Sequence, residues 1–123
     1  MSNISVFAKI YNKTYKKICG VLPSPFPWHF QWLATVYLNK SLKQELLLLT
    51  GKVLDVGCGG APYRIWCSST AEYIGLDVVD GPEVDVCVKE GEMWELDQSY
   101  FDSVMSTQVL EHVKDLQFTV DEI

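Results

Sequence analysis

The sequence lacks the features that mark membrane-spanning, disordered and secreted chains. No apolar run is longer than the four leucines at 46–49, far short of the ~20 residues that a transmembrane helix requires. There is no low-complexity tract, and 48% of the 123 residues are hydrophobic, which suffices for one domain with a core. The first residues have neither the apolar segment nor the small-residue cleavage site of a secretory signal. We therefore expect a globular, cytoplasmic protein.

Cysteines are few, and their spacing is not that of metal ligands. The chain has four of them, Cys19, Cys58, Cys67 and Cys87. No two form a CxxC pair, and no histidine lies nearby at metal-ligand spacing. We predict buried, reduced thiols, with neither a disulfide framework nor a metal site.

Positive charge is scarce beyond the first 45 residues. That segment contains six lysines and one glutamate, whereas the whole chain has a net charge of −6. The rest of the chain is therefore strongly acidic. Such a surface suits nucleic acid poorly, because contacts between basic side chains and phosphates supply most of that affinity. The charge favours a neutral or cationic small ligand, and we expect no nucleic-acid partner.

Residues 1–50 are expected to form a helical N-terminal extension. In residues 4–19 apolar side chains share one helical face and four lysines lie opposite. Further helices are expected at about 28–38 and 41–49. Two interpretations of the helix at 4–19 stay open. We favour a lid packed over a ligand cleft, and the alternative is a helix that makes peripheral contact with an anionic membrane surface.

The pattern changes at residue 51 to short β-rich runs. Near-continuous apolar strands that alternate with helical or turn signals predict an α/β domain over residues 51–123, built on a parallel sheet. In such a sheet, ligands bind at the carboxyl ends of the strands. We expect four strands, at 52–56, 72–77, 84–88 and 101–106, and helical segments at 62–68 and 113–123.

The most informative stretch is VLDVGCGG at 53–60, where a strand continues directly into glycines. Glycines let the backbone turn sharply and approach a ligand closely. A dinucleotide loop requires Gly or Ala at the sixth position of GxGxxG, where this sequence has Pro62, and Asp55 would repel a pyrophosphate. The same carboxylate would attract an ammonium or a sulfonium. An ordinary strand-to-helix turn stays open as the alternative.

Asp77 ends the second expected strand, 20 residues after Gly57. A carboxylate at this place accepts hydrogen bonds from the ribose hydroxyls of a bound nucleoside. Taken alone, an aspartate at a strand end is more often a solvated turn residue. In combination with the glycine loop at this spacing, it favours nucleoside binding.

Three motifs occur in order between residues 51 and 123, namely GKVLDVGCGGAPYR, YIGLDV and FDSVMSTQVLEHV. Together they resemble the class I S-adenosylmethionine-dependent methyltransferases, and especially bacterial small-molecule enzymes of the methyltransferase type 11 kind. The resemblance implies a Rossmann-like parallel sheet, of which this chain would hold the N-terminal half with about four strands. It also implies S-adenosyl-L-methionine as the cofactor.

The resemblance further assigns roles to particular residues. The methionine end of the cofactor would lie against the glycine loop, at Asp55, Gly57, Cys58 and Gly59. Asp77 would hold the ribose, and Glu90 and Met93 would lie near the adenine. His112, after the fourth strand, is a candidate general base because imidazole side chains can take up a proton near neutral pH. A capping or packing role for His112 is the alternative.

The resemblance leaves two functions open. We expect methyl transfer to a small-molecule, lipid or glycan-type acceptor. The alternative is a truncated, non-catalytic nucleoside-binding module, because the family's RVLKPGG segment is absent from this sequence. In the family's strand order 3-2-1-4-5-7-6 the fourth strand would lose one neighbour. We therefore also expect an exposed sheet edge that favours self-association, with little activity of the chain alone.

Overall fold

The computed structural model describes Ile10, Thr14 and residues 32–123. The predicted helix at 4–19, with its lid and membrane-surface interpretations, lies almost wholly outside the described residues. The chain divides into two compact units, Met1–Leu42 and Lys43–Ile123. No helix among the described residues is long and apolar enough to cross a membrane.

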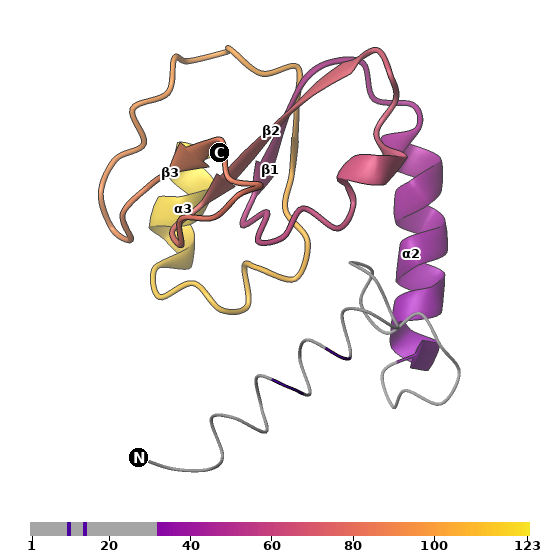
Figure 1. The fold of residues 1–123 in the computed structure, drawn as a ribbon. Coiled ribbons are helices and arrows are strands. Elements are labelled where there is room, and N and C mark those ends of the chain that lie inside the picture. The colour runs from indigo at the N-terminus through magenta and orange to yellow at the C-terminus, as the bar shows by residue number, and fades with distance from the viewer. Residues whose placement is uncertain (1–9, 11–13, 15–31) are drawn as a thin grey trace. The chain divides into compact units, whose positions relative to one another are not determined.

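A single helix, α2 (Trp32–Leu46), occupies the region where two helices were predicted. The predicted break between 28–38 and 41–49 is therefore wrong, as Figure 1 shows. The break was placed at Asn39 and Lys40, but neither residue disfavours a helix by more than a fraction of 1 kcal/mol. With no glycine or proline between residues 32 and 46, the backbone hydrogen bonds continue.

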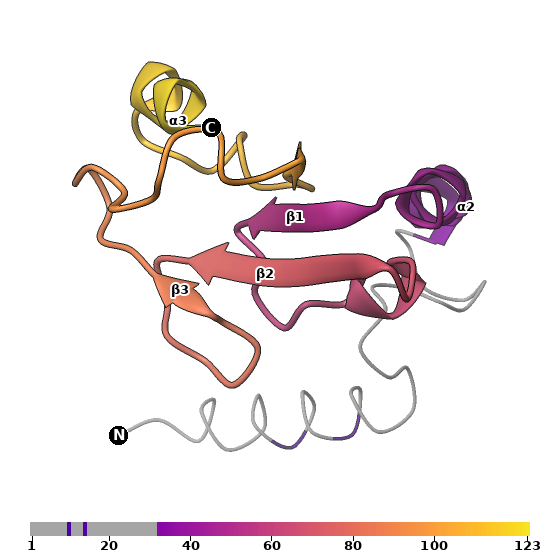
Figure 2. The ribbon, with the colours of Figure 1, turned by 90° about the horizontal axis from the view of Figure 1, so that it is seen from above.

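Four parallel strands form the sheet of the second unit, in the order β3-β2-β1-β4. Figure 2 shows β1 (Gly51–Val56) and β2 (Ala71–Asp77) side by side and pointing the same way. They pair over six positions, and β4 (Ser103–Met105) pairs with the other side of β1. β3 (Val86–Cys87) pairs with β2. The prediction of an α/β fold with a Rossmann-like parallel sheet is confirmed.

The outer elements are shorter than the sequence predicted. The strands expected at 84–88 and 101–106 contain two and three residues, and each pairs with one described neighbour. The helical segment expected at 62–68 is a single 3-10 turn, η1 (Arg64–Trp66). The last helix, α3 (Leu116–Glu122), begins three residues later than expected.

The core of the second unit surrounds the two central strands. Leu54, Val56 and Leu76 are at most 3% exposed and form one cluster. Partly buried side chains from the segment between β3 and β4, including Trp94, pack against it. Strands buried on both faces are normally apolar throughout. Asp55, which is 2% exposed, is a buried charged residue in β1 and an exception to this rule. It lies next to the candidate site.

The described cysteines are free, as predicted, but they are not all buried. Cys58 is buried, Cys67 is half-buried and Cys87 is exposed, so the expectation of burial is wrong for Cys87. Its strand, β3, is the outermost in the sheet, which leaves the thiol uncovered. Cys19 lies outside the described residues. Within the described part of the chain, no group of three or more His, Cys, Asp or Glu side chains is placed to hold a metal ion.

Candidate functional site

The glycine loop after β1 turns sharply and packs closely against the segment that follows β4. Gly57 has a φ of +76° and Gly59 a φ of +53°, values that glycine adopts without steric cost. A Cβ at Gly57 would lie only 2.4 Å from Cγ2 of Val109. The N–H groups of Gly57 and Cys58 donate to the carbonyl of Leu76 at 2.7 and 3.1 Å. The loop is thus tied to the carboxyl end of β2.

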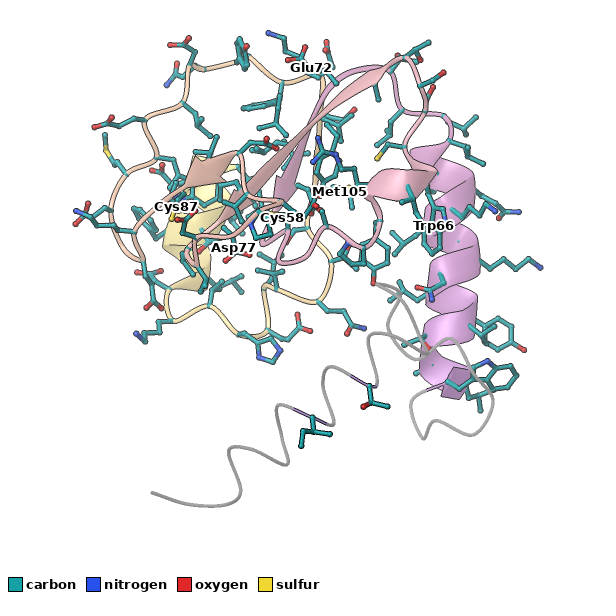
Figure 3. The ribbon with its side chains drawn as sticks, in the orientation of Figure 1. Cys58, Trp66, Glu72, Asp77, Cys87 and Met105 are labelled. Atoms are coloured by element: carbon teal, nitrogen blue, oxygen red, sulfur yellow. The ribbon has the colours of Figure 1, made fainter. Side chains whose placement is uncertain are left out.

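Asp77 lies beside this loop at the end of β2, and Figure 3 shows it close to Cys58. The N–H of Gly59 donates to its Oδ2 at 2.8 Å, and the N–H of Val79 donates to its Oδ1 at 3.0 Å. Each carboxylate oxygen has lone pairs for a second hydrogen bond. The side chain is therefore oriented by the backbone and can still accept hydrogen bonds from a ligand.

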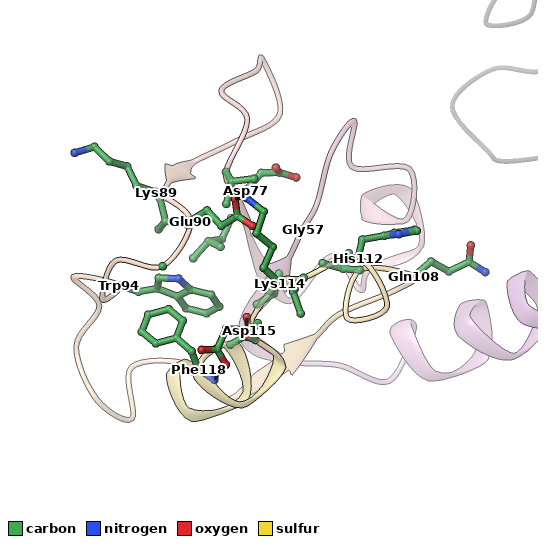
Figure 4. A pocket seen from close by; sticks show the side chains of 18 residues that line it. Gly57, Asp77, Lys89, Glu90, Trp94, Gln108, His112, Lys114, Asp115 and Phe118 are labelled. Atoms are coloured by element: carbon green, nitrogen blue, oxygen red, sulfur yellow. Dashed lines mark hydrogen bonds and ion pairs between the residues drawn. The ribbon is translucent and has the colours of Figure 1, made fainter.

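A cavity of about 440 Å³ opens at this edge of the sheet. Its volume is within the ~300–1,000 Å³ that small-molecule sites occupy. Figure 4 shows Gly57 and Asp77 on its wall, together with residues from the segments after β3 and β4. The two motifs separated by 20 residues in the sequence therefore meet in one hollow, as the rule for carboxyl ends of parallel strands predicts.

One wall of the cavity is aromatic. Trp94 comes from the segment after β3 and Phe118 from α3, and both line the cavity (Figure 4). The backbone N–H of Trp94 donates to Oε2 of Glu122 at 2.6 Å. The carboxylate of Asp115 accepts from the N–H of Phe118 at 3.0 Å. Both rings are thus held through the ends of α3, and they offer an apolar surface to a planar group.

An ion pair crosses the rim of the cavity. Nζ of Lys114 lies 2.7 Å from Oε2 of Glu90, and their side chains are 81% and 52% exposed. Exposed pairs contribute little to stability because water screens them. A ligand group that binds Glu90 can therefore replace Lys114 at small cost.

Asp55 lies beneath the glycine loop and does not line the cavity, although the next two residues, Val56 and Gly57, do. The hydroxyl of Tyr73 donates a hydrogen bond to its Oδ2. Burial raises the pKa of Asp55 above its usual value, and the negative charge of Asp77 adds to this rise, while the Tyr73 hydrogen bond opposes it. The site therefore contains a buried carboxylate with one described hydroxyl partner.

The cavity brings together four of the predicted site residues, Gly57, Asp77, Glu90 and His112. It does not include Asp55, Cys58, Gly59 or Met93 among its lining. The Met93 side chain is 78% exposed. Burial and nearby carboxylates raise the pKa of the Cys58 thiol to about 11, so this thiol stays protonated near neutral pH. The roles assigned to these residues remain predictions.

Sequence reasoning missed the aromatic wall and the tyrosine behind the loop. Trp94 and Phe118 lie outside the three motifs that carry the family resemblance. Tyr73 read as an ordinary strand residue. The one signal of this wall in the sequence was an aromatic residue in a segment that follows a strand end, and Trp94 is such a residue.

Comparison with known proteins identifies a family whose matched residues include the candidate site. A model of the methyltransferase domain family matches residues 54–123. No curated protein and no solved structure matches the chain. The matched range begins within β1 and contains every residue that lines the cavity.

Proposed function

The chain belongs to the methyltransferase domain family, and we propose that it binds S-adenosyl-L-methionine in this cavity and transfers the methyl group to a small-molecule, lipid or glycan-type acceptor. The observation that carries the proposal is the hydrogen bond from Gly59 to Asp77. It joins a glycine loop that permits close backbone approach to a carboxylate oriented for ribose hydroxyls. Both groups belong to the same edge of the sheet.

The residues present fit this cofactor. Asp77 has free acceptor capacity for the ribose, and the Trp94 and Phe118 rings suit a planar adenine. Glu90 on the rim can accept a hydrogen bond from the adenine amino group. A mostly apolar cavity with a few placed polar groups is typical of cofactor sites. The carboxylates of Asp55 and Asp77 complement the ammonium and sulfonium charges of the methionine end.

Methyl transfer from a sulfonium depends more on aligning the acceptor with the methyl group than on activating either of them. When bound, the cofactor supplies a methyl group on a sulfonium, which is already a good leaving group, so much of the acceleration comes from holding the acceptor in line. The exposed His112 lines the cavity, and its backbone N–H donates to Val109 at 2.8 Å, which orients the residue. We propose His112 as the group that takes a proton from an acceptor hydroxyl or amine.

The test is calorimetry with S-adenosylmethionine, its demethylated product S-adenosylhomocysteine, and NAD. Both nucleosides should bind and NAD should not. Asp77→Asn should weaken both nucleosides by about 1–3 kcal/mol, since a ribose hydroxyl loses its charged acceptor. The matched control is Asp80→Asn, an exposed aspartate three residues later that lies outside the cavity lining, and it should bind as the wild type does.

Two outcomes would overturn parts of this proposal. Tight NAD binding, or nucleoside binding that ignores Asp77→Asn, would contradict the site. Nucleoside binding without methyl transfer to any tested alcohol, amine, lipid or glycan would favour the alternative, a non-catalytic binding module. Release of S-adenosylhomocysteine that depends on an added acceptor would support the transferase.

We further propose that the reaction takes place in the cytoplasm. Its support is that the described cysteines, Cys58, Cys67 and Cys87, are free, with no disulfide among them. Reducing compartments keep thiols in this state. A fractionation experiment that finds the protein with membranes in low salt, and releases it in high salt, would instead favour peripheral membrane contact, which is the alternative interpretation of residues 4–19.

A further inference from the structure

Tyr73 and Asp55 face each other across the two central strands. In the register of β1 and β2, Val53 is opposite Tyr73 and Asp55 is opposite Gly75. Residues two apart in a strand share a face, so Tyr73 lies diagonal to Asp55, and the glycine opposite Asp55 presents no side chain. The tyrosine hydroxyl donates to Oδ2 of Asp55. Both residues are buried, at 8% and 2% exposure.

The ring of Tyr73 is held from another direction by a cation. The guanidinium carbon of Arg64 lies 5.1 Å from the ring centroid, within the ~6 Å at which cation–π attraction operates. Arg64 is itself anchored by an ion pair with Glu83, at 3.2 Å. The tyrosine is therefore fixed by contacts that do not involve its hydroxyl, and the hydroxyl is aimed at Asp55.

Little else near Asp55 favours its charged form. Burial and the charge of Asp77 both favour the protonated carboxyl, whereas the Tyr73 hydrogen bond favours the carboxylate. The charge of Asp55 also contributes to raising the pKa of three neighbouring groups, Cys58, Tyr63 and Cys67, so these stay neutral. Arg64 is engaged by Glu83. Among the described residues, Tyr73 is thus the group that supports the carboxylate.

We propose that Tyr73 is a positioning residue, whose hydroxyl orients Asp55 and keeps it negatively charged beneath the glycine loop so that the site prefers the sulfonium cofactor over its neutral thioether product. This inference rests on the proposed function. S-adenosylmethionine and S-adenosylhomocysteine share the ribose, the adenine and the amino acid group, and they differ by one methyl group and one positive charge. A buried charge acts on that difference through space, because the protein interior screens it less than water does.

The experiment measures the ratio of the two affinities by calorimetry on the full chain from about pH 5 to 9. In the wild type, the preference for S-adenosylmethionine should rise with pH as Asp55 loses its proton. Tyr73→Phe removes one oxygen and keeps the ring that Arg64 contacts. It should move the midpoint of that rise upward by about one pH unit. Between the two midpoints, the preference of this variant should be lower than that of the wild type by up to about tenfold.

A matched control separates this role from a general effect on packing. Tyr63→Phe removes the same atom from a tyrosine that is 7% exposed and makes no described hydrogen bond to Asp55. It should leave the midpoint unchanged. Asp55→Asn should abolish the pH dependence of the preference, and this variant tests the inference even if Tyr73→Phe does not fold. Asp77→Asn should weaken both ligands, because both lose the same ribose contact.

Each further result decides between the inference and the proposed function. If both nucleosides bind and Tyr73→Phe keeps the wild-type midpoint and ratio, the positioning role is wrong. The same conclusion follows if Tyr63→Phe shifts the midpoint equally, or if Asp55→Asn keeps the pH dependence. If neither nucleoside binds the wild type, the proposed function itself fails.

Discussion

At the scale of single residues, a side chain that serves the site can reduce the stability of the fold. Asp55 occupies an interior position of β1 among apolar neighbours that are almost fully buried. A carboxylate there loses hydration, and one hydroxyl and nearby dipoles replace it only in part. Residues that serve binding commonly reduce stability in this way. Its effect on stability should therefore depend on pH.

We expect Asp55→Asn to be more stable than the wild type at neutral pH. Because the pKa of Asp55 is raised in the folded state, mainly by burial, the wild type has its full stability below the unfolded pKa of about 4 and loses part of it as pH rises through the folded pKa. An amide does not titrate and can still accept from Tyr73. Urea unfolding of both proteins at several pH values measures the difference.

This stability difference should shrink as the pH falls toward about 4, because below that pH Asp55 is protonated in both the folded and the unfolded state. Asp80→Asn, at an exposed position, is the control and should show no such trend. A constant destabilisation of Asp55→Asn at every pH would show that the carboxylate is not a burden to the fold.

Among the elements, α3 depends most on the contacts at its ends. It has seven residues, fewer than the ~12–15 that an isolated helix needs in water. Asp115 caps its N-terminus through the N–H of Phe118, and the hydroxyl of Thr119 donates to the carbonyl of Asp115 at 2.9 Å. At the other end, Glu122 holds the backbone of Trp94. These end contacts therefore connect α3 to both residues of the aromatic wall.

Asp115→Ala should lower the free energy of unfolding by about 1 kcal/mol, the usual cost of losing an N-cap. It should also weaken nucleoside binding, because Phe118 would no longer be held in the wall. Asp115→Asn can still accept from the same N–H, and it separates capping from charge. Urea midpoints and dissociation constants of the three proteins test this. Asp121→Ala, at an exposed position in the same helix, serves as control, and an equal loss there would refute the capping role.

At the scale of the whole molecule, β4 is one of the two edges of the described sheet. It pairs with β1 through three residues and is last in the strand order, so no described strand covers its other side. Val104 in this strand is 38% exposed. An uncovered strand edge presents backbone donors and acceptors to another chain.

We therefore expect the 123-residue chain to self-associate as its concentration rises, with light scattering after size-exclusion chromatography as the measurement. Val104→Lys should reduce this association, because a lysine on an edge strand opposes pairing. Val120→Lys, which adds the same charge on α3, is the control. A monomer at every concentration, or equal dissociation by both variants, would show that the β4 edge is not the contact.

The sequence by itself determined the central strands, the strand order through the family it resembles, and the meeting of Gly57 with Asp77. These features follow from local signals, since apolar runs define β1 and β2 and glycines define the turn between strand and loop. Parallel strands then bring their carboxyl ends to one edge without further information. Glu90 and His112 lie at the cavity for the same reason, because each follows a strand of that sheet.

Only the tertiary structure decided which side chains complete the site. Trp94 meets α3 through Glu122, 28 residues later, and Tyr73 meets Asp55 across 18 residues. Such pairs depend on register and on which elements pack together, and no periodicity in the sequence encodes them. The short outer strands have the same origin. Their local preference for β structure is weak, so pairing with the backbone of a neighbouring strand decides how long each of them is.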